Sequence, residues 1–122
     1  MRFMTMVKSD ESQPAGPPPP ALFAAVAQLG EEAKKAGVFV ETGGLLPSAV
    51  NGARIKVAQG QITATDGPFT EAKEVVGGYA VYDVKSKEEV MQWAMRFAAL
   101  HRDLWPGWDG EIEVRQMMDF AG

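Results

Sequence analysis

Apolar and polar residues alternate loosely along residues 2–8, which predicts a first strand that is partly covered on both faces. One face would carry Phe3, Thr5 and Val7, and the other Met4 and Met6. Five of the eight prolines follow in residues 12–20, and such a segment neither extends a strand nor enters a helix interior. This segment is therefore expected to be a loop.

Residues 21–36 carry the three- and four-residue spacing of apolar positions that is typical of an amphipathic helix. The apolar positions are Leu22, Val26, Leu29, Ala33 and Ala36. Gly37 follows directly and is the residue expected to end the helix in a left-handed conformation.

A second strand is predicted from residue 38 to 40, ending in turn signals that include Gly43 and Gly44. Two short apolar runs then flank Gln59-Gly60, which predicts a β-hairpin. Residues 79–84 are rich in Tyr and Val and form a further expected strand.

Ser86 and Glu89 have the spacing of a capping box, so a second helix should begin there. Its buried stripe would be Val90, Trp93, Phe97 and Leu100. A last strand is predicted where Ile112, Val114 and Gln116 alternate with Glu111, Glu113 and Arg115.

This order predicts an α+β fold, a ferredoxin-like split βαβ arrangement with a hairpin inserted at its middle, in a single domain over residues 1–122. Helices would cover only one face of the sheet. The other face, together with the C-terminus, offers more apolar surface than a monomer usually exposes. Its residues are Met4, Met6, Tyr79, Val81, Met117 and Met118. We therefore expect a homodimer that packs sheet on sheet.

Composition narrows the class of protein. The 122 residues include no cysteine and one histidine, so disulfides, thiol nucleophiles and multi-histidine metal sites are excluded. The net charge of −4 comes without any basic block, which argues against direct binding to nucleic acid. The longest apolar stretch, residues 21–27, is far shorter than the roughly 18 residues that a membrane span needs. The N-terminus has no signal-peptide core. We expect a cytoplasmic protein with no metal and no resident cofactor.

The run from Asp66 to Glu74, DGPFTEAKE, followed by Gly77-Gly78-Tyr79, resembles the signature of the DGPF proteins, a branch of the YCII-related family. Glu113-Val114-Arg115 extends the resemblance into the last strand, and Gly43-Gly44-Leu45 is similar to the family's turn after the second strand.

The resemblance implies a dimeric α+β barrel and a frequent link with extracytoplasmic-function sigma factors. Some YCII-related relatives are thought to be enzymes that use a His-Asp pair, with the histidine in the first helix. Residues 21–36 contain no histidine, so that pair cannot be carried over to this chain.

Asp66 is the first candidate for chemistry, and two interpretations stay open. It could cap its own turn by accepting backbone hydrogen bonds. Alternatively, Glu71, Lys73 and Glu74 could converge with it at a pocket mouth, where neighbouring charges set the pKa of its carboxyl group.

Other candidates are weaker. Gly77 and Gly78 could form a bulge or allow close backbone approach to a ligand, and Tyr79 and Arg115 are further ligand-binding candidates. His101, near the end of the second helix, is expected as an imidazolium at the helix terminus, with a catalytic role oriented by Asp103 as the alternative.

Trp105 and Trp108 are expected to cover the edge of the core or a dimer contact rather than to stack on a ligand.

Two hypotheses about function remain. The preferred one is a homodimeric small-ligand-binding or regulatory module linked with sigma-factor regulation. The alternative is a cofactor-independent enzyme that does carboxylate acid–base chemistry on a small polar or anionic metabolite, with Asp66 assisted by Lys73, Arg115 or His101.

Overall fold

A computed structural model describes residues 1–119 and contains two helices and six strands in that part of the chain, an α+β fold as predicted. The elements are β1 (Arg2–Ser9), α1 (Pro20–Lys35), β2 (Phe39–Gly44), β3 (Ala53–Ala58), β4 (Gln61–Asp66), β5 (Val75–Asp83), α2 (Lys87–Leu104) and β6 (Glu111–Gln116). Four strands form an antiparallel sheet in the order β2-β5-β1-β6, and β3 and β4 form a separate hairpin.

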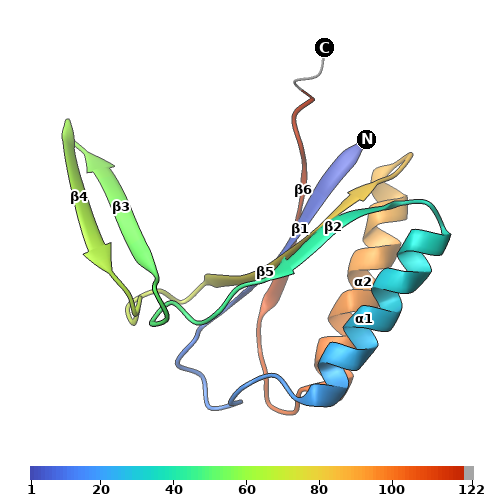
Figure 1. The fold of residues 1–122 in the computed structure, drawn as a ribbon, viewed down its shortest axis with the longest axis horizontal. Helices are drawn as coiled ribbons and strands as arrows, with labels where there is room; N and C mark the ends of the chain where they lie inside the picture. The colour runs from blue at the N-terminus through green and yellow to red at the C-terminus, as the bar shows by residue number, and fades with distance from the viewer. Residues whose placement is uncertain (120–122) are drawn as a thin grey trace.

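Both helices pack on one face of the sheet (Figure 1). That face carries Phe3, Ala80 and Tyr82, which form the core with Ala33 of α1 and Val90 of α2. Ala33 and Val90 have no exposed surface, so the two helices meet the sheet without a gap at this level. The alternation predicted for β1 is confirmed, because Phe3 and Thr5 are buried while Met4 and Met6 are half-buried on the opposite face.

The helix boundaries follow from the residues at their ends. Gly37 has a φ of 77°, the left-handed conformation expected after α1. At the start of α2, Ser86 Oγ accepts a hydrogen bond from the Glu89 backbone N–H at 3.1 Å. The carboxylate of Glu89 accepts one in turn from the Lys85 N–H at 3.1 Å, so the capping interaction is confirmed with one residue of displacement.

The prediction that Gly43 and Gly44 form a turn is wrong. Both belong to β2, and Gly43 pairs with Tyr79 of β5. A Cβ atom at position 43 would lie 2.8 Å from the Tyr79 ring. The glycine is needed because the tyrosine ring crosses it, not because the chain turns there.

Gly77 occupies a β-bulge, as one of the two interpretations of the glycine pair predicted. Val7 pairs with Gly78 and Lys8 pairs with Val76, which leaves Gly77 as the extra residue. Gly78 is buried and packs against the Gly43 carbonyl.

The β3–β4 hairpin lies apart from the sheet (Figure 1). Its turn is Gln59-Gly60, as predicted, and both residues have positive φ values of 51° and 77°. Every residue of the two strands is exposed. Among the described residues, no helix has the length and apolar character that a membrane span needs.

Candidate functional site

The largest cavity described lies at one end of the helix face of the sheet and has a volume of about 640 Å³. Its wall combines the start of α1, the end of α2, the start of β5, and the loops that follow β1, β2 and α2. Apolar and aromatic side chains dominate the lining, among them Leu22, Phe23, Val26, Leu45, Leu46, Phe97, Trp105 and Trp108. This size and lining are typical of small-molecule sites.

His101 lies in this wall with only 5% of its surface exposed. Its ring packs within an aromatic cage, with ring centroids 4.6 Å from Phe97, 4.9 Å from Trp108 and 6.1 Å from Trp105. Burial lowers the pKa of the imidazole below its usual 6.5, although a backbone hydrogen bond to Phe97 partly opposes this. The expected imidazolium at the helix end is therefore wrong, because the ring is turned into the protein instead of toward water.

The proton of the neutral ring is assigned from its hydrogen bond. Nδ1 lies 3.0 Å from the Phe97 carbonyl oxygen, which can only accept, so Nδ1 carries the hydrogen. Nε2 is then an unprotonated acceptor with no hydrogen-bond partner among residues 1–119. In this part of the chain, every completely buried side-chain nitrogen or oxygen has a hydrogen-bond partner. Because Nε2 has none, it is not completely buried, and it is open to the cavity that His101 lines.

The loops that enclose the cavity are tied together by polar side chains. Gln13, in the loop after β1, donates through Nε2 to the Asp109 carbonyl at 2.9 Å and accepts through Oε1 from the Asp109 N–H at 2.8 Å. Trp105 Nε1–H donates to the Ala15 carbonyl at 3.4 Å. These bonds hold the loop after β1 against the loop after α2, and so fix the two indoles.

A second set of bonds holds the loop after β2. The Glu11 carboxylate accepts from the Ser48 N–H at 2.7 Å and from Ser48 Oγ–H at 2.5 Å, and Ser48 Oγ accepts from the Phe69 N–H at 2.9 Å. Gly52 and Gly67 both lie against the Ser48 carbonyl, where a Cβ atom would be 2.2 Å and 2.0 Å from the oxygen. The glycine of the DGPF segment is therefore required by this close contact with the loop that carries Leu45 and Leu46.

The structure separates Asp66 from the other charged candidates. Asp66 is exposed at the end of β4 and lines neither cavity described, and its carboxylate accepts no hydrogen bond within residues 1–119. The predicted cap is wrong, because the residue two positions on is Pro68, which has no N–H. The Phe69 N–H is already bound to Ser48.

Glu71 and Lys73 do not converge with Asp66 either. Glu71 pairs with Arg54, whose guanidinium also lies 4.1 Å from the centroid of the Phe69 ring. The Arg54 hydrogen bond lowers the pKa of Glu71. Lys73 is 84% exposed and lies 3.7 Å from Asp10 in the loop after β1. These charges stabilise the base of the hairpin instead of forming a shared carboxylate site.

The remaining candidates divide between the cavity and the open sheet face. Gly78 and Tyr79 line the cavity, and the Tyr79 hydroxyl donates to Glu41 at 2.8 Å, which raises the pKa of the tyrosine. Arg115 is exposed on β6 and lies 3.4 Å from Glu113. Asp103 does not orient His101, because it pairs with the adjacent Arg102 at 2.7 Å.

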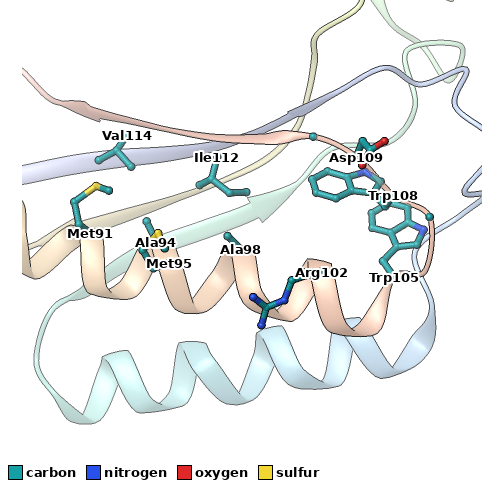
Figure 2. Close-up of a pocket in the computed structure, with 12 residues that line it drawn as sticks. Met91, Ala94, Met95, Ala98, Arg102, Trp105, Trp108, Asp109, Ile112 and Val114 are labelled. Carbon is teal, nitrogen blue, oxygen red and sulfur yellow. The ribbon is translucent and has the colours of Figure 1, made fainter.

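A smaller cavity of about 370 Å³ runs between α2 and β6 (Figure 2). Figure 2 shows Met91 and Met95 of α2 on one side, Ile112 and Val114 of β6 on the other, and the indoles of Trp105 and Trp108 at one end. The two indoles are stacked at 5.4 Å with 15° between their planes, and they line both cavities. They form part of the wall of both cavities, and stacking on a ligand, the less favoured expectation from the sequence, stays a prediction.

Sequence reasoning missed Glu11 and Ser48 altogether. Neither residue lies in a periodic segment or a motif, and their pairing joins positions 37 residues apart. Among the described residues, no cluster of three or more His, Asp or Glu side chains is arranged to hold a metal ion.

A search of curated proteins finds no match to this chain. The profile of the YCII-related domain matches residues 1–121, nearly the whole chain. The match is consistent with the resemblance carried by the DGPF segment. The chain belongs to the YCII-related family.

Proposed function

We propose that this protein binds a small molecule in the cavity around His101. The observation that carries the proposal is a neutral imidazole whose Nε2 lone pair is open to a cavity of about 640 Å³ with a largely apolar wall. Nε2 is exposed to the cavity and has no protein partner among residues 1–119, so its lone pair is available to accept a hydrogen bond from a ligand. A ligand hydroxyl or N–H group would supply that hydrogen bond.

The wall also indicates the class of ligand. The stacked indoles and the Phe97 ring offer flat surfaces, which favour an aromatic or planar ligand. Asp10 and Glu11 are among the residues that line the cavity, and no Lys or Arg is among them. Because the lining offers no cation to pair with an anion, we propose an uncharged planar ligand with one hydrogen-bond donor, which is narrower than the small polar or anionic metabolite expected from the sequence.

The proposal includes a homodimer in the dimeric α+β barrel arrangement, with each sheet in the ferredoxin-like order. Support comes from the sheet face opposite the helices, where Met4, Met6 and Val81 lie on the two central strands. The link with sigma-factor regulation and the cytoplasmic location stay predictions.

An enzyme is the second candidate, and the state of His101 favours it. A neutral histidine whose Nε2 faces a cavity can act as a general base. This moves the acid–base role from Asp66, which is exposed and lies outside the cavity, to His101. Turnover would then decrease as the pH is lowered, because the imidazole becomes protonated with a pKa below 6.5.

The binding test uses the tryptophans of the cavity as reporters. The chain has three tryptophans, and Trp93→Phe leaves only Trp105 and Trp108, both in the cavity wall. Titration of this variant with a library of small uncharged aromatic alcohols and amides should change its fluorescence for some members. His101→Phe in the same background keeps an aromatic ring but removes Nε2, and should weaken the binding of those members about tenfold.

Asp103→Asn is the matched control, because Asp103 is exposed two residues away and should leave binding unchanged. Equal affinity in the His101→Phe variant would contradict the proposed site. The matched aromatic carboxylates should be titrated beside the library, and binding of these anions without binding of any uncharged member would contradict the proposed ligand class.

A further inference from the structure

The β3–β4 hairpin has one apolar face and one polar face. Ile55 pairs with Ala64 and Val57 pairs with Ile62, so these four side chains lie on the same side of the ribbon and form what we call the hairpin face. Ile55 is 71% exposed, and Val57 and Ile62 are each 73% exposed. The other side carries Arg54, Lys56, Thr63 and Thr65. A two-sided pattern of this kind predicts that the apolar side is covered by another surface.

Residues 1–119 hold the base of this hairpin but do not cover its two strands. A two-stranded ribbon is at best marginally stable alone. Its base is held by the Gly67 N–H, which donates to the Gly52 carbonyl at 2.8 Å, and by the contact of both glycines with Ser48. Figure 1 shows the hairpin rising from the end of the sheet on the side away from α1 and α2. The hairpin therefore stands beside the open face of the sheet.

The open face of the sheet has the composition of a protein interface. Its centre, on the adjacent strands β1 and β5, carries Met4 and Met6, which are half-buried, and Val81, which is 3% exposed. Its edges carry Glu41 on β2 and Glu111, Glu113 and Arg115 on β6. Tyr79 donates to Glu41, and Lys8 and Arg115 pair with Glu113. An apolar centre with a paired polar rim is the anatomy of interfaces between proteins.

The open sheet face alone is small for a stable interface between two subunits. Four strands of about six residues, at about 4.8 Å between strands and 3.3 Å per residue, have a flat outline of roughly 400 Å², a lower bound on their accessible surface. A standard interface buries about 800 Å² on each partner. A second copy seated on the open face would also lie against the hairpin, and in a two-fold pair each chain both gives a hairpin and receives one. The two hairpin contacts supply much of the missing area.

We propose that the hairpin is an arm between subunits: where the open sheet faces of two copies meet, the hairpin face of each chain packs at the margin of the second copy's open sheet face. The inference rests on the proposed homodimer and adds the segment that makes it stable. The occupant is a second copy because the same chain carries both apolar surfaces, and the hairpin rises on the side of the sheet that the helices leave open (Figure 1).

The first test measures the dimer dissociation constant by analytical ultracentrifugation. The triple variant Ile55→Thr, Val57→Thr and Ile62→Thr keeps β-branched residues while it removes apolar surface. We expect the dissociation constant to rise at least about 30-fold. The matched control changes the opposite side of the ribbon, by Lys56→Thr, Thr63→Ser and Thr65→Ser, and should leave the constant within about threefold.

The outcomes distinguish failure of the proposed arm from failure of the proposed homodimer. A wild-type chain that stays monomeric at about 100 μM would overturn the proposed homodimer and the arm with it. A triple variant that dimerises as tightly as the wild type would overturn the arm and leave the dimer standing.

The second test locates the contact. Because the chain has no cysteine, Val57→Cys can carry a single benzophenone label. After irradiation of a mixture of ¹⁵N-labelled and unlabelled chains, mass spectrometry should find adducts between a heavy and a light chain on the peptides of β1 or β5. Adducts confined to one chain, or adducts of one hairpin with another, would overturn the proposed contact. The same label at Thr63→Cys, on the polar side, should give far fewer adducts between chains.

Discussion

Gly67 lies against the backbone carbonyl of Ser48, so that a Cβ atom at position 67 would be 2.0 Å from that oxygen. The DGPF segment thus stabilises the fold at the junction where the hairpin, the loop after β2 and the loop after β1 meet. Ser48 joins all three, through its carbonyl, its N–H and its hydroxyl group.

The substitution Gly67→Ala should lower the free energy of unfolding by about 2 to 3 kcal/mol, because a backbone atom must move to make room. Urea denaturation measures this. Gly77→Ala is the control, since no heavy atom lies within 4 Å of a Cβ atom there, and it should stay within about 0.5 kcal/mol of wild type. Equal stability of the two variants would show that the Ser48 contact is not needed.

Asp66→Asn and Asp66→Ala should both leave stability within about 0.5 kcal/mol of wild type. The carboxylate is exposed and accepts no hydrogen bond within the described part of the chain, so neither change removes an interaction. Ligand binding should also be unchanged. Thermal melting checks the stability of both variants, and the fluorescence titration checks their ligand binding. A loss of binding in the Asn variant, with stability unchanged, would show that Asp66 belongs to the ligand site.

Trp93→Ala should destabilise the protein by about 2 kcal/mol, less than the 3 to 5 kcal/mol typical of a fully buried tryptophan. Trp93 is half-buried and stacks on Tyr82 at 6.2 Å between ring centroids. Met95→Ala, at a position 64% exposed on the same helix, is the control and should cost less than about 0.5 kcal/mol. A Trp93 variant as stable as the Met95 variant would contradict this packing.

Stability should depend on pH through His101. In the folded state its pKa lies below the usual 6.5. As the pH falls below 6.5, the unfolded chain takes up the proton first, so the free energy of unfolding decreases until the pH reaches the folded-state pKa, and this contribution then levels off. The loss amounts to about 1.4 kcal/mol for each unit by which folding lowers the pKa.

The His101→Phe variant isolates this effect, since the carboxylates that line the cavity, Asp10 and Glu11, are present in both proteins. Urea denaturation from pH 7.5 to pH 5 should show a steeper loss of stability in the wild type. Parallel curves for the two proteins would mean that folding leaves the pKa of His101 unchanged.

The elements of the fold could be predicted because each has a local signal. Gln59-Gly60 selects the hairpin turn, Ser86 and Glu89 start α2, and Gly37 ends α1. The prediction of a turn at Gly43 and Gly44 is wrong because a glycine pair is equally typical of a turn and of a strand position that a large side chain crosses. Only the position of Tyr79 on the neighbouring strand distinguishes the two.

The candidate site could be predicted only in part. His101, Gly78 and Tyr79 were candidates and line the cavity, but their meeting with Glu11 and with the indoles depends on contacts between distant segments. The position of His101 at a helix end suggested exposure. The loop that carries Trp105 and Trp108 folds back over the ring instead, so burial prevails over the favourable effect of the helix end.

Measuring the protonation state of the His101 ring tests the proposed ligand site most directly. The chain has a single histidine, so ¹⁵N labelling of histidine in a tag-free protein gives the signals of one imidazole. At pH 7 the spectrum should show a neutral ring protonated at Nδ1, with a pKa below 6.5, and a bound ligand should shift the Nε2 signal in the direction of an accepted hydrogen bond. An imidazolium at pH 7, or an Nε2 signal that no bound ligand moves, would contradict the proposed site.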